Sequence, residues 1–126
     1  MARETLEGGC HCGAVRFRVD VDEFEASECN CSMCTMKGIL HYIVTPDRFR
    51  LLKGRESLAT YTFNTRVAKH TFCKTCGIHP FYTPRSDPDK VDVNIRCLDG
   101  DAWQRFSLTT FDGKHWEAAQ AARKGH

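Results

Sequence analysis

Residues 8–21 read Gly-Gly-Cys-His-Cys-Gly-Ala-Val-Arg-Phe-Arg-Val-Asp-Val. From Val15 onward, apolar and charged side chains alternate with the two-residue period of a half-buried β-strand. Cys10 and Cys12 lie two positions apart, so in an extended segment both thiols point to the same side. Glycines on either side of the pair free the backbone to bend around it. The stretch therefore predicts a strand that begins beside two thiols on one face.

Further strand patterns occur along the chain. Residues 59–63 and 91–96 alternate apolar and polar side chains, and residues 39–44 form a short apolar run rich in β-branched and aromatic residues. Turn-forming pairs that contain proline or glycine separate these segments. Residues 116–124 form an alanine-rich helical pattern, and Gly125 follows as a stop signal. We predict a mainly β fold of antiparallel sheets with a short C-terminal helix.

Length and charge narrow the class of protein. The chain has 126 residues, close to the commonest size of one domain, and we expect residues 1–126 to form a single domain. Lys+Arg 18 nearly balance Asp+Glu 16 and are scattered, so no nucleic-acid partner is expected. Residues 1–9 carry charges without an apolar core. We therefore expect neither a signal peptide nor a membrane partner, and a cytoplasmic location.

The eight cysteines are clustered. In a reducing cytosol, clustered thiols bind metal more often than they form disulfides. Neighbouring cysteines cannot readily bridge each other, yet two of them can bind one ion with sulfur–metal distances of about 2.3 Å. The clusters are Cys10 with Cys12, then Cys29 with Cys31 and Cys34, then Cys73 with Cys76, while Cys97 stands alone.

The first and third clusters predict a closed zinc site. Cys73 and Cys76 precede Gly77 in a knuckle pattern, in which a tight turn aims two thiolates at one metal ion. Cys10 and Cys12 supply the second half of a tetrahedral shell. Such a site would tie distant parts of the chain together and contribute directly to folding.

The middle cluster predicts a site of another kind. Cys29, Cys31 and Cys34 provide three ligands and leave one coordination position open, as catalytic zinc requires. Three thiolates suit a soft ligand such as a substrate thiolate. Two alternatives remain: Cys97 or a histidine such as His41 fills the fourth position, or the three thiols form a redox group.

The cysteine-containing segments resemble the glutathione-dependent formaldehyde-activating enzyme family. Residues 8–17, 29–34 and 72–77 read GGCHCGAVRF, CNCSMC and FCKTCG and carry the resemblance. The chain is more closely similar to the centromere protein V branch of that family. That similarity comes from YTFNT at 61–65, HTFC at 70–73, FYTPRS at 81–86 and CLD at 97–99.

The resemblance implies a fold of the Mss4-like type with two zinc ions. It implies formation or cleavage of the carbon–sulfur bond of S-(hydroxymethyl)glutathione, and hence a carbon–sulfur lyase or synthase with glutathione as its small-molecule thiol substrate. The alternative is a non-enzymatic zinc-ribbon-like module that binds a protein partner. The resemblance places structural zinc on Cys10, Cys12, Cys73 and Cys76, and catalytic zinc on Cys29, Cys31 and Cys34.

The implied reaction needs a proton at the developing alkoxide. His41 or His70 could deliver it, because an unperturbed histidine titrates near neutrality. His11 lies between two ligands and would point away from them in an extended segment, so we expect a surface or supporting position. Cys97 follows a predicted strand, where a cysteine is more often a small buried apolar residue than a ligand.

Substrate-binding residues carry weaker signals. Lys37, Arg48 and Arg66 could pair with glutathione carboxylates, although a solvated surface charge is the commoner role for each. Phe81 and Tyr82 could line the mouth of a pocket, although aromatic residues of a small β domain more often pack in its core.

Overall fold

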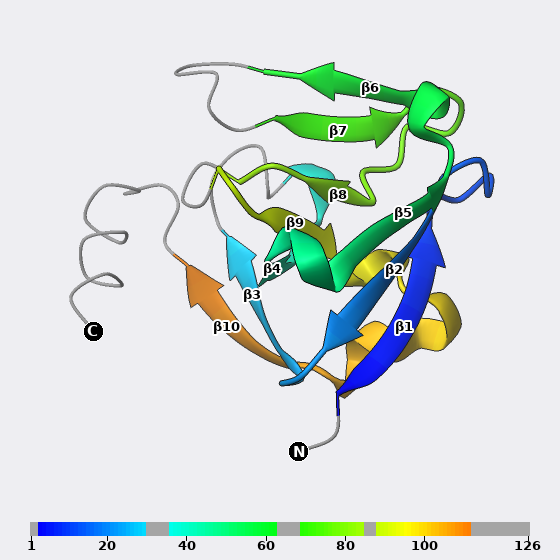
Figure 1. Cartoon of the computed structure of the whole chain (residues 1–126). Coiled ribbons are helices and arrows are strands. Elements are labelled where there is room, and N and C mark those ends of the chain that lie inside the picture. Colours follow the sequence, from blue (N-terminus) through cyan, green and yellow to red (C-terminus); the bar gives the residue numbers. More distant parts are fainter. Residues whose placement is uncertain (1–2, 30–35, 63–68, 85–87, 112–126) are drawn as a thin grey trace.

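The computed structural model describes residues 3–29, 36–62, 69–84 and 88–111, which form three β-sheets (Figure 1). The helix predicted over residues 116–124 lies outside the described residues. In the described part, the mainly β class predicted from the alternating segments is confirmed.

The first sheet, sheet A, grows from the stretch that begins with the first cysteine pair. Phe17, Val19 and Val21 are each at most 1% exposed, which confirms the alternation predicted for this strand. The strand pairs antiparallel with a neighbour on each side. In spatial order the strands are β1 (Glu4–Gly9), β2 (Arg16–Val21) and β5 (Phe49–Lys53), and the 3₁₀ turn η1 (Pro46–Arg48) precedes β5.

Sheet B has five strands. In spatial order they are β10 (Ser107–Phe111), β3 (Glu25–Cys29), β4 (Leu40–Val44), β9 (Val91–Asn94) and β8 (Phe81–Tyr82). All neighbours are antiparallel except β10 and β3, which run parallel. The predicted antiparallel sheets are thus confirmed, with one parallel pair at this edge, because the chain crosses over from β9 before β10 joins the opposite edge.

That crossover consists of two 3₁₀ helices, η3 (Ile95–Cys97) and η4 (Asp99–Arg105). The strand pattern of residues 91–96 predicts a longer strand than β9, which ends at Asn94. The Asn94 side chain accepts a hydrogen bond from the backbone N–H of Arg96 and so caps η3. Asn94 has the spacing of a polar strand position, yet its side chain caps η3 and so ends β9.

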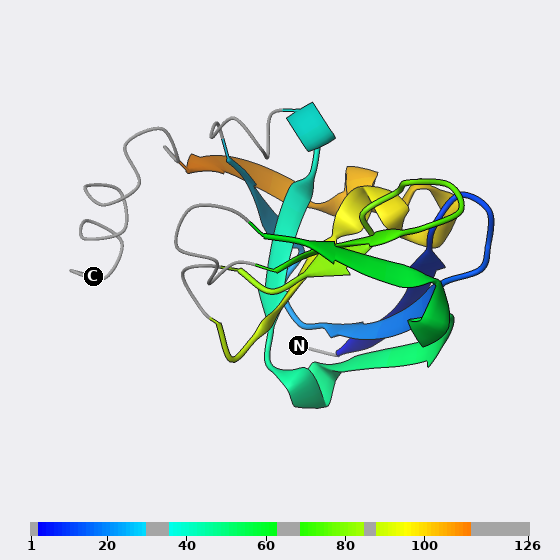
Figure 2. The same ribbon diagram turned by 90° about the horizontal axis from the view of Figure 1, so that it is seen from above.

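Sheet C covers one side of sheet B (Figures 1 and 2). It pairs β6 (Leu58–Tyr61) antiparallel with β7 (His70–Cys73), and the turn η2 (Arg55–Ser57) precedes β6. Lys69 and Thr83 exchange two backbone hydrogen bonds of 2.9 Å, which connect β7 to β8. Tyr61, an apolar position of the alternating segment 59–63, is 49% exposed.

The two faces of sheet B differ in polarity. Leu40 and Val93 lie on the face that packs against Phe17 of sheet A, in the main apolar core. On the opposite face, under sheet C, His41 and Asp92 are only 5% and 1% exposed. The polar positions predicted as the solvent side of β9 are therefore buried between two layers.

Candidate functional site

Two turns bring together the four cysteines predicted for the closed site. Cys10 directly follows β1, and a backbone hydrogen bond of 3.1 Å from its N–H to the Val15 carbonyl closes the turn around the first pair. Cys73 ends β7, and its carbonyl accepts from the N–H of Gly77 at 2.8 Å. Gly77 has a φ of 79°, a left-handed conformation that favours glycine.

The four sulfurs of these turns fit one metal ion. The Sγ atoms of Cys10, Cys12, Cys73 and Cys76 all lie within 4.8 Å of one another. Sγ of Cys12 lies 3.6 Å from those of both Cys10 and Cys73. A tetrahedral ion with sulfur–metal distances of about 2.3 Å would separate its ligands by about 3.8 Å. The predicted grouping is thus confirmed as a cluster that could hold one metal ion.

The thiols of this cluster do not ionise independently. The backbone N–H of Ala14 favours the Cys12 thiolate, but desolvation and the neighbouring sulfurs outweigh it and raise the pKa of Cys12 to about 11. Desolvation opposes ionisation of Cys76, yet hydrogen bonds led by the backbone of Ile78 lower the pKa of Cys76 to about 6. Some thiolates thus form readily, whereas full ionisation of four adjacent sulfurs requires a compensating cation.

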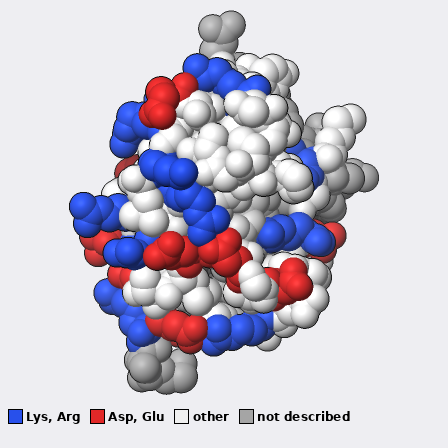
Figure 3. All heavy atoms as spheres, turned by 90° about the vertical axis from the view of Figure 1, so that its right-hand side faces the viewer, with Lys and Arg blue, Asp and Glu red and all other residues white. Residues whose placement is uncertain are grey.

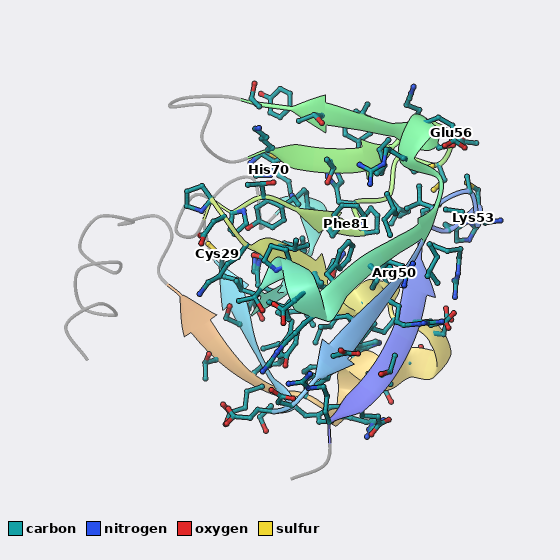
Figure 4. The ribbon with its side chains drawn as sticks, viewed as in Figure 1. Cys29, Arg50, Lys53, Glu56, His70 and Phe81 are labelled. Atoms are coloured by element: carbon teal, nitrogen blue, oxygen red, sulfur yellow. The ribbon has the colours of Figure 1, made fainter. Side chains whose placement is uncertain are left out.

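Cys29 lies apart from this cluster, at the end of β3 (Figure 4). Its side chain is half-buried and packs against Ile39 and Tyr82, on the face of sheet B that sheet C covers. Figure 4 shows His70 of β7 on the same side of the molecule. The other two cysteines of the predicted open site, Cys31 and Cys34, lie outside the described residues.

A buried acid–base group adjoins Cys29. Nδ1 of His41 lies 2.7 Å from Oδ2 of Asp92 and 3.2 Å from the hydroxyl of Tyr82. Within the described part of the chain, Nε2 of His41 and Oδ1 of Asp92 are buried and have no hydrogen-bond partner. Buried polar atoms are normally satisfied, so each of these two atoms requires a partner from outside the described residues.

Three further side chains extend this polar layer. Nζ of Lys37 lies 3.1 Å from Nδ1 of His70 and 4.4 Å from the centroid of the Tyr82 ring. The His70 and Tyr82 rings stack with centroids 5.0 Å apart. Burial, followed by the charge of Lys37, lowers the pKa of His79 to about 4. The sequence identified Lys37 and both catalytic-histidine candidates, and the structure groups them here.

Other candidates lie elsewhere. Arg48 pairs with Asp22, which also binds Arg3. The guanidinium of Arg48 therefore belongs to a surface ion-pair group. His11 is exposed, as expected for a surface position. Arg66 lies outside the described residues.

Two remaining candidates belong to the interior. Burial, reinforced by the sulfurs of Cys10 and Cys76, raises the pKa of Cys97 to about 12. Its Sγ lies 3.8 Å from the carbonyl oxygen of His79. Phe81 packs against the rings of Phe17 and Phe49, in keeping with the core role expected for it.

Asp92 and Asn94 were missed by sequence reasoning as members of the site. They occupy the polar positions of an alternating strand, a pattern that predicts a solvent-facing side. Asn94 Oδ1 accepts from the backbone N–H of Leu40, and its Nδ2 donates to the carbonyl of His79. No signal within β9 itself distinguishes a side that faces water from a side covered by another sheet.

The outer surface shows no single-sign field on the face drawn in Figure 3, where basic and acidic side chains alternate. Ion pairs such as Arg105 with Glu4 and Arg16 with Asp99 account for part of this mixture. Among the described residues, no helix is long and apolar enough to cross a membrane.

Comparisons with known proteins show which family and which solved structure the chain is similar to. Residues 5–111 match the family model described as glutathione-dependent formaldehyde-activating enzyme. A crystal structure of a Rhodobacter sphaeroides protein is similar, with 37% sequence identity and a TM-score of 0.72. The match covers 82% of this chain and 100% of that one.

Proposed function

Because the chain belongs to the glutathione-dependent formaldehyde-activating enzyme family, we propose that it is a zinc-dependent carbon–sulfur lyase. It forms or cleaves S-(hydroxymethyl)glutathione, the adduct of glutathione and formaldehyde. The observation that carries the proposal is the position of Cys29, half-buried beside the acid–base group of His41 and Asp92. A thiol-binding site needs an adjacent proton-transfer group for this chemistry.

We assign two zinc ions to the chain. The four-sulfur cluster of Cys10, Cys12, Cys73 and Cys76 has the ligand set of structural zinc, and its sulfur spacing supports that assignment. Cys29, with Cys31 and Cys34 from the segment that follows it, would hold the second zinc. When bound, that ion would lower the pKa of the glutathione thiol and hold its sulfur as a thiolate.

The chain's own residues would orient the substrate. Ile39 and Tyr82, 1% and 7% exposed, form an apolar wall against Cys29 and exclude water from the reacting sulfur. The Lys37 ammonium has three donors, so it can bind a glutathione carboxylate while one hydrogen is donated to His70. This arrangement makes addition to the aldehyde effectively intramolecular. We place the reaction in the cytoplasm, where free thiols persist.

Exchange spectroscopy of glutathione and formaldehyde tests the function. The wild-type protein should accelerate exchange between the free thiol and its hydroxymethyl adduct and should contain two zinc ions. Cys29→Ser should reduce the acceleration by at least about 100-fold, because a ligand of the open zinc is removed. Cys97→Ser is the matched control, since this thiol lies outside both ligand sets, and it should retain the wild-type rate.

Wild-type protein with both zinc ions and no effect on exchange would overturn the proposed reaction. A single tightly held metal ion together with unchanged exchange would instead favour a non-catalytic module that binds a protein partner.

A further inference from the structure

We propose that Nε2 of His41 is the atom that moves the proton during carbon–sulfur bond formation, with Asp92 as its positioning residue. This inference rests on the proposed function and deepens it, because it selects one histidine and one ring nitrogen. It starts from a buried side chain whose two nitrogens have different surroundings: Nδ1 has close partners, whereas Nε2 has none among the described residues.

The partners of Nδ1 determine its protonation. An ionised Asp92 carboxylate can only accept, so at 2.7 Å the His41 Nδ1–H donates to Oδ2. The Tyr82 oxygen at 3.2 Å can share that hydrogen as a second acceptor. Nδ1 thus keeps its proton whether the ring is neutral or charged. Nε2 is the nitrogen that can gain and lose one.

His70 differs from His41 in the partner of its Nδ1. The ammonium of Lys37 can only donate, so the Nδ1 lone pair of His70 accepts its hydrogen at 3.1 Å. The His70 ring is held further by stacking on Tyr82. A ring whose bare nitrogen already binds a cation is a poor acceptor for a substrate proton, so the contacts separate two histidines that sequence reasoning left equivalent.

The strand register places His41 beside the thiol site. Ser27 of β3 lies opposite His41 of β4, and Cys29 is two positions further along β3. Because side chains alternate along a strand, Cys29 lies on the same face as Ser27 and is a diagonal neighbour of His41. Diagonal neighbours are about 7–8 Å apart. Tyr82 packs against Cys29 and also approaches His41.

The proposed step balances without another reactant. Neutral Nε2 accepts the proton released from the glutathione S–H. The sulfur lone pair forms the carbon–sulfur bond while the carbonyl π pair moves to oxygen. Nε2 then returns the same proton to that oxygen and completes the hydroxymethyl group. In the reverse direction, Nε2 removes the hydroxyl proton, the carbon–sulfur bond breaks, and the proton returns to sulfur.

Steady-state exchange kinetics of His41→Gln, with zinc analysis, test the role. We expect kcat to fall by about 100-fold or more, KM to stay within about threefold, and both zinc ions to remain, because the group acts on the proton alone. His11→Gln, at an exposed histidine, is the matched control and should retain the wild-type kcat.

Asp92→Asn tests whether Asp92 positions the His41 ring. An amide can donate a hydrogen bond to Nδ1, which would allow the tautomer of His41 that carries its hydrogen on Nε2. The variant should lower kcat by about 10-fold or more with the zinc content unchanged. Tyr82→Phe is the second variant, in case Asp92→Asn does not fold. It keeps the ring packing and removes one oxygen near Nδ1, so we expect a folded protein with a smaller loss of kcat than in Asp92→Asn.

Three results would overturn the inference, and each is distinct from failure of the function. The first is a wild-type kcat in His41→Gln. The second is loss of one zinc ion from His41→Gln, which would make His41 a ligand. The third is a ¹⁵N NMR spectrum of the wild type that places the fixed hydrogen on Nε2. If the wild type does not accelerate exchange at all, the proposed function fails. The NMR spectrum then still supports or overturns the assignment of the free nitrogen.

Discussion

The four-cysteine cluster and the Cys29 end of β3 use the same ligand atom in opposite surroundings. In the cluster, the sulfurs lie close to one another and to backbone N–H groups, and apolar side chains such as Val15 pack around Cys10 and Cys73. Around Cys29 lie an apolar wall and, on the same covered face, two histidines and an aspartate. The difference teaches that a closed metal shell needs only its ligands, whereas a reacting thiol needs groups that can exchange protons.

The largest effect should separate these two regions by stability. Cys73→Ser should remove one metal ion and lower the free energy of unfolding by more than about 4 kcal/mol, because a fully buried ligand that connects sheet C to β1 is lost. Under the proposed two-zinc assignment, Cys29→Ser should remove the second metal ion and leave the unfolding midpoint within a few degrees of the wild type. Chemical denaturation with metal analysis measures both, and equal stability losses would erase the distinction.

An intermediate effect concerns His79, which lies between the Cys76 turn and β8. Its folded pKa of about 4 is below its ordinary value of 6.5, so the unfolded chain binds the proton more tightly. The contribution of neutral His79 to the free energy of unfolding is fully present above pH 6.5 and is lost as pH falls through about 4. Allowing for partial exposure of the ring, wild type should lose about 1–2 kcal/mol more than His79→Gln across this range.

Urea titrations at several pH values, with metal content followed in parallel, measure this difference. Identical slopes of stability against pH in the two proteins would show that His79 is protonated equally in the folded and unfolded states.

The smallest effect should come from the surface, away from both cysteine regions. Arg105 donates two hydrogen bonds of 2.8 Å to Glu4, which hold the pKa of that carboxyl below its ordinary value. The benefit is present at neutral pH and is lost as pH falls through the lowered folded value. Glu4→Gln should therefore lower the melting temperature by no more than about 2 °C at pH 7. The difference should vanish once Glu4 is protonated in both the folded and unfolded states, and calorimetry in low and high salt checks it.

Local sequence patterns were enough to predict part of this structure. The alternation in β2 correctly identified Phe17, Val19 and Val21 as core residues, because one face of that strand packs and the other is solvated. Cysteine spacing also predicted the four-sulfur cluster, since two short turns determine which thiols point together. Both results depend on geometry within a few residues of each motif.

Long-range layering was beyond such patterns. Asp92 has the spacing of an outward strand position, yet it is 1% exposed because sheet C covers that face. The parallel pairing of β10 with β3 depends on a crossover through η3 and η4 that strand periodicity does not encode. The open site stays a prediction at Cys31 and Cys34, which lie outside the described residues.

Strand β7 connects the four-cysteine cluster to the acid–base layer near Cys29. It is four residues long, with Cys73 of the sulfur cluster at one end and His70, stacked on Tyr82, at the other. At about 3.4 Å per residue, the two ends are about 10 Å apart. A metal ion held by the sulfur cluster would therefore fix the position of the strand that covers the acid–base layer. A metal that takes no part in the chemistry would still govern whether water reaches it.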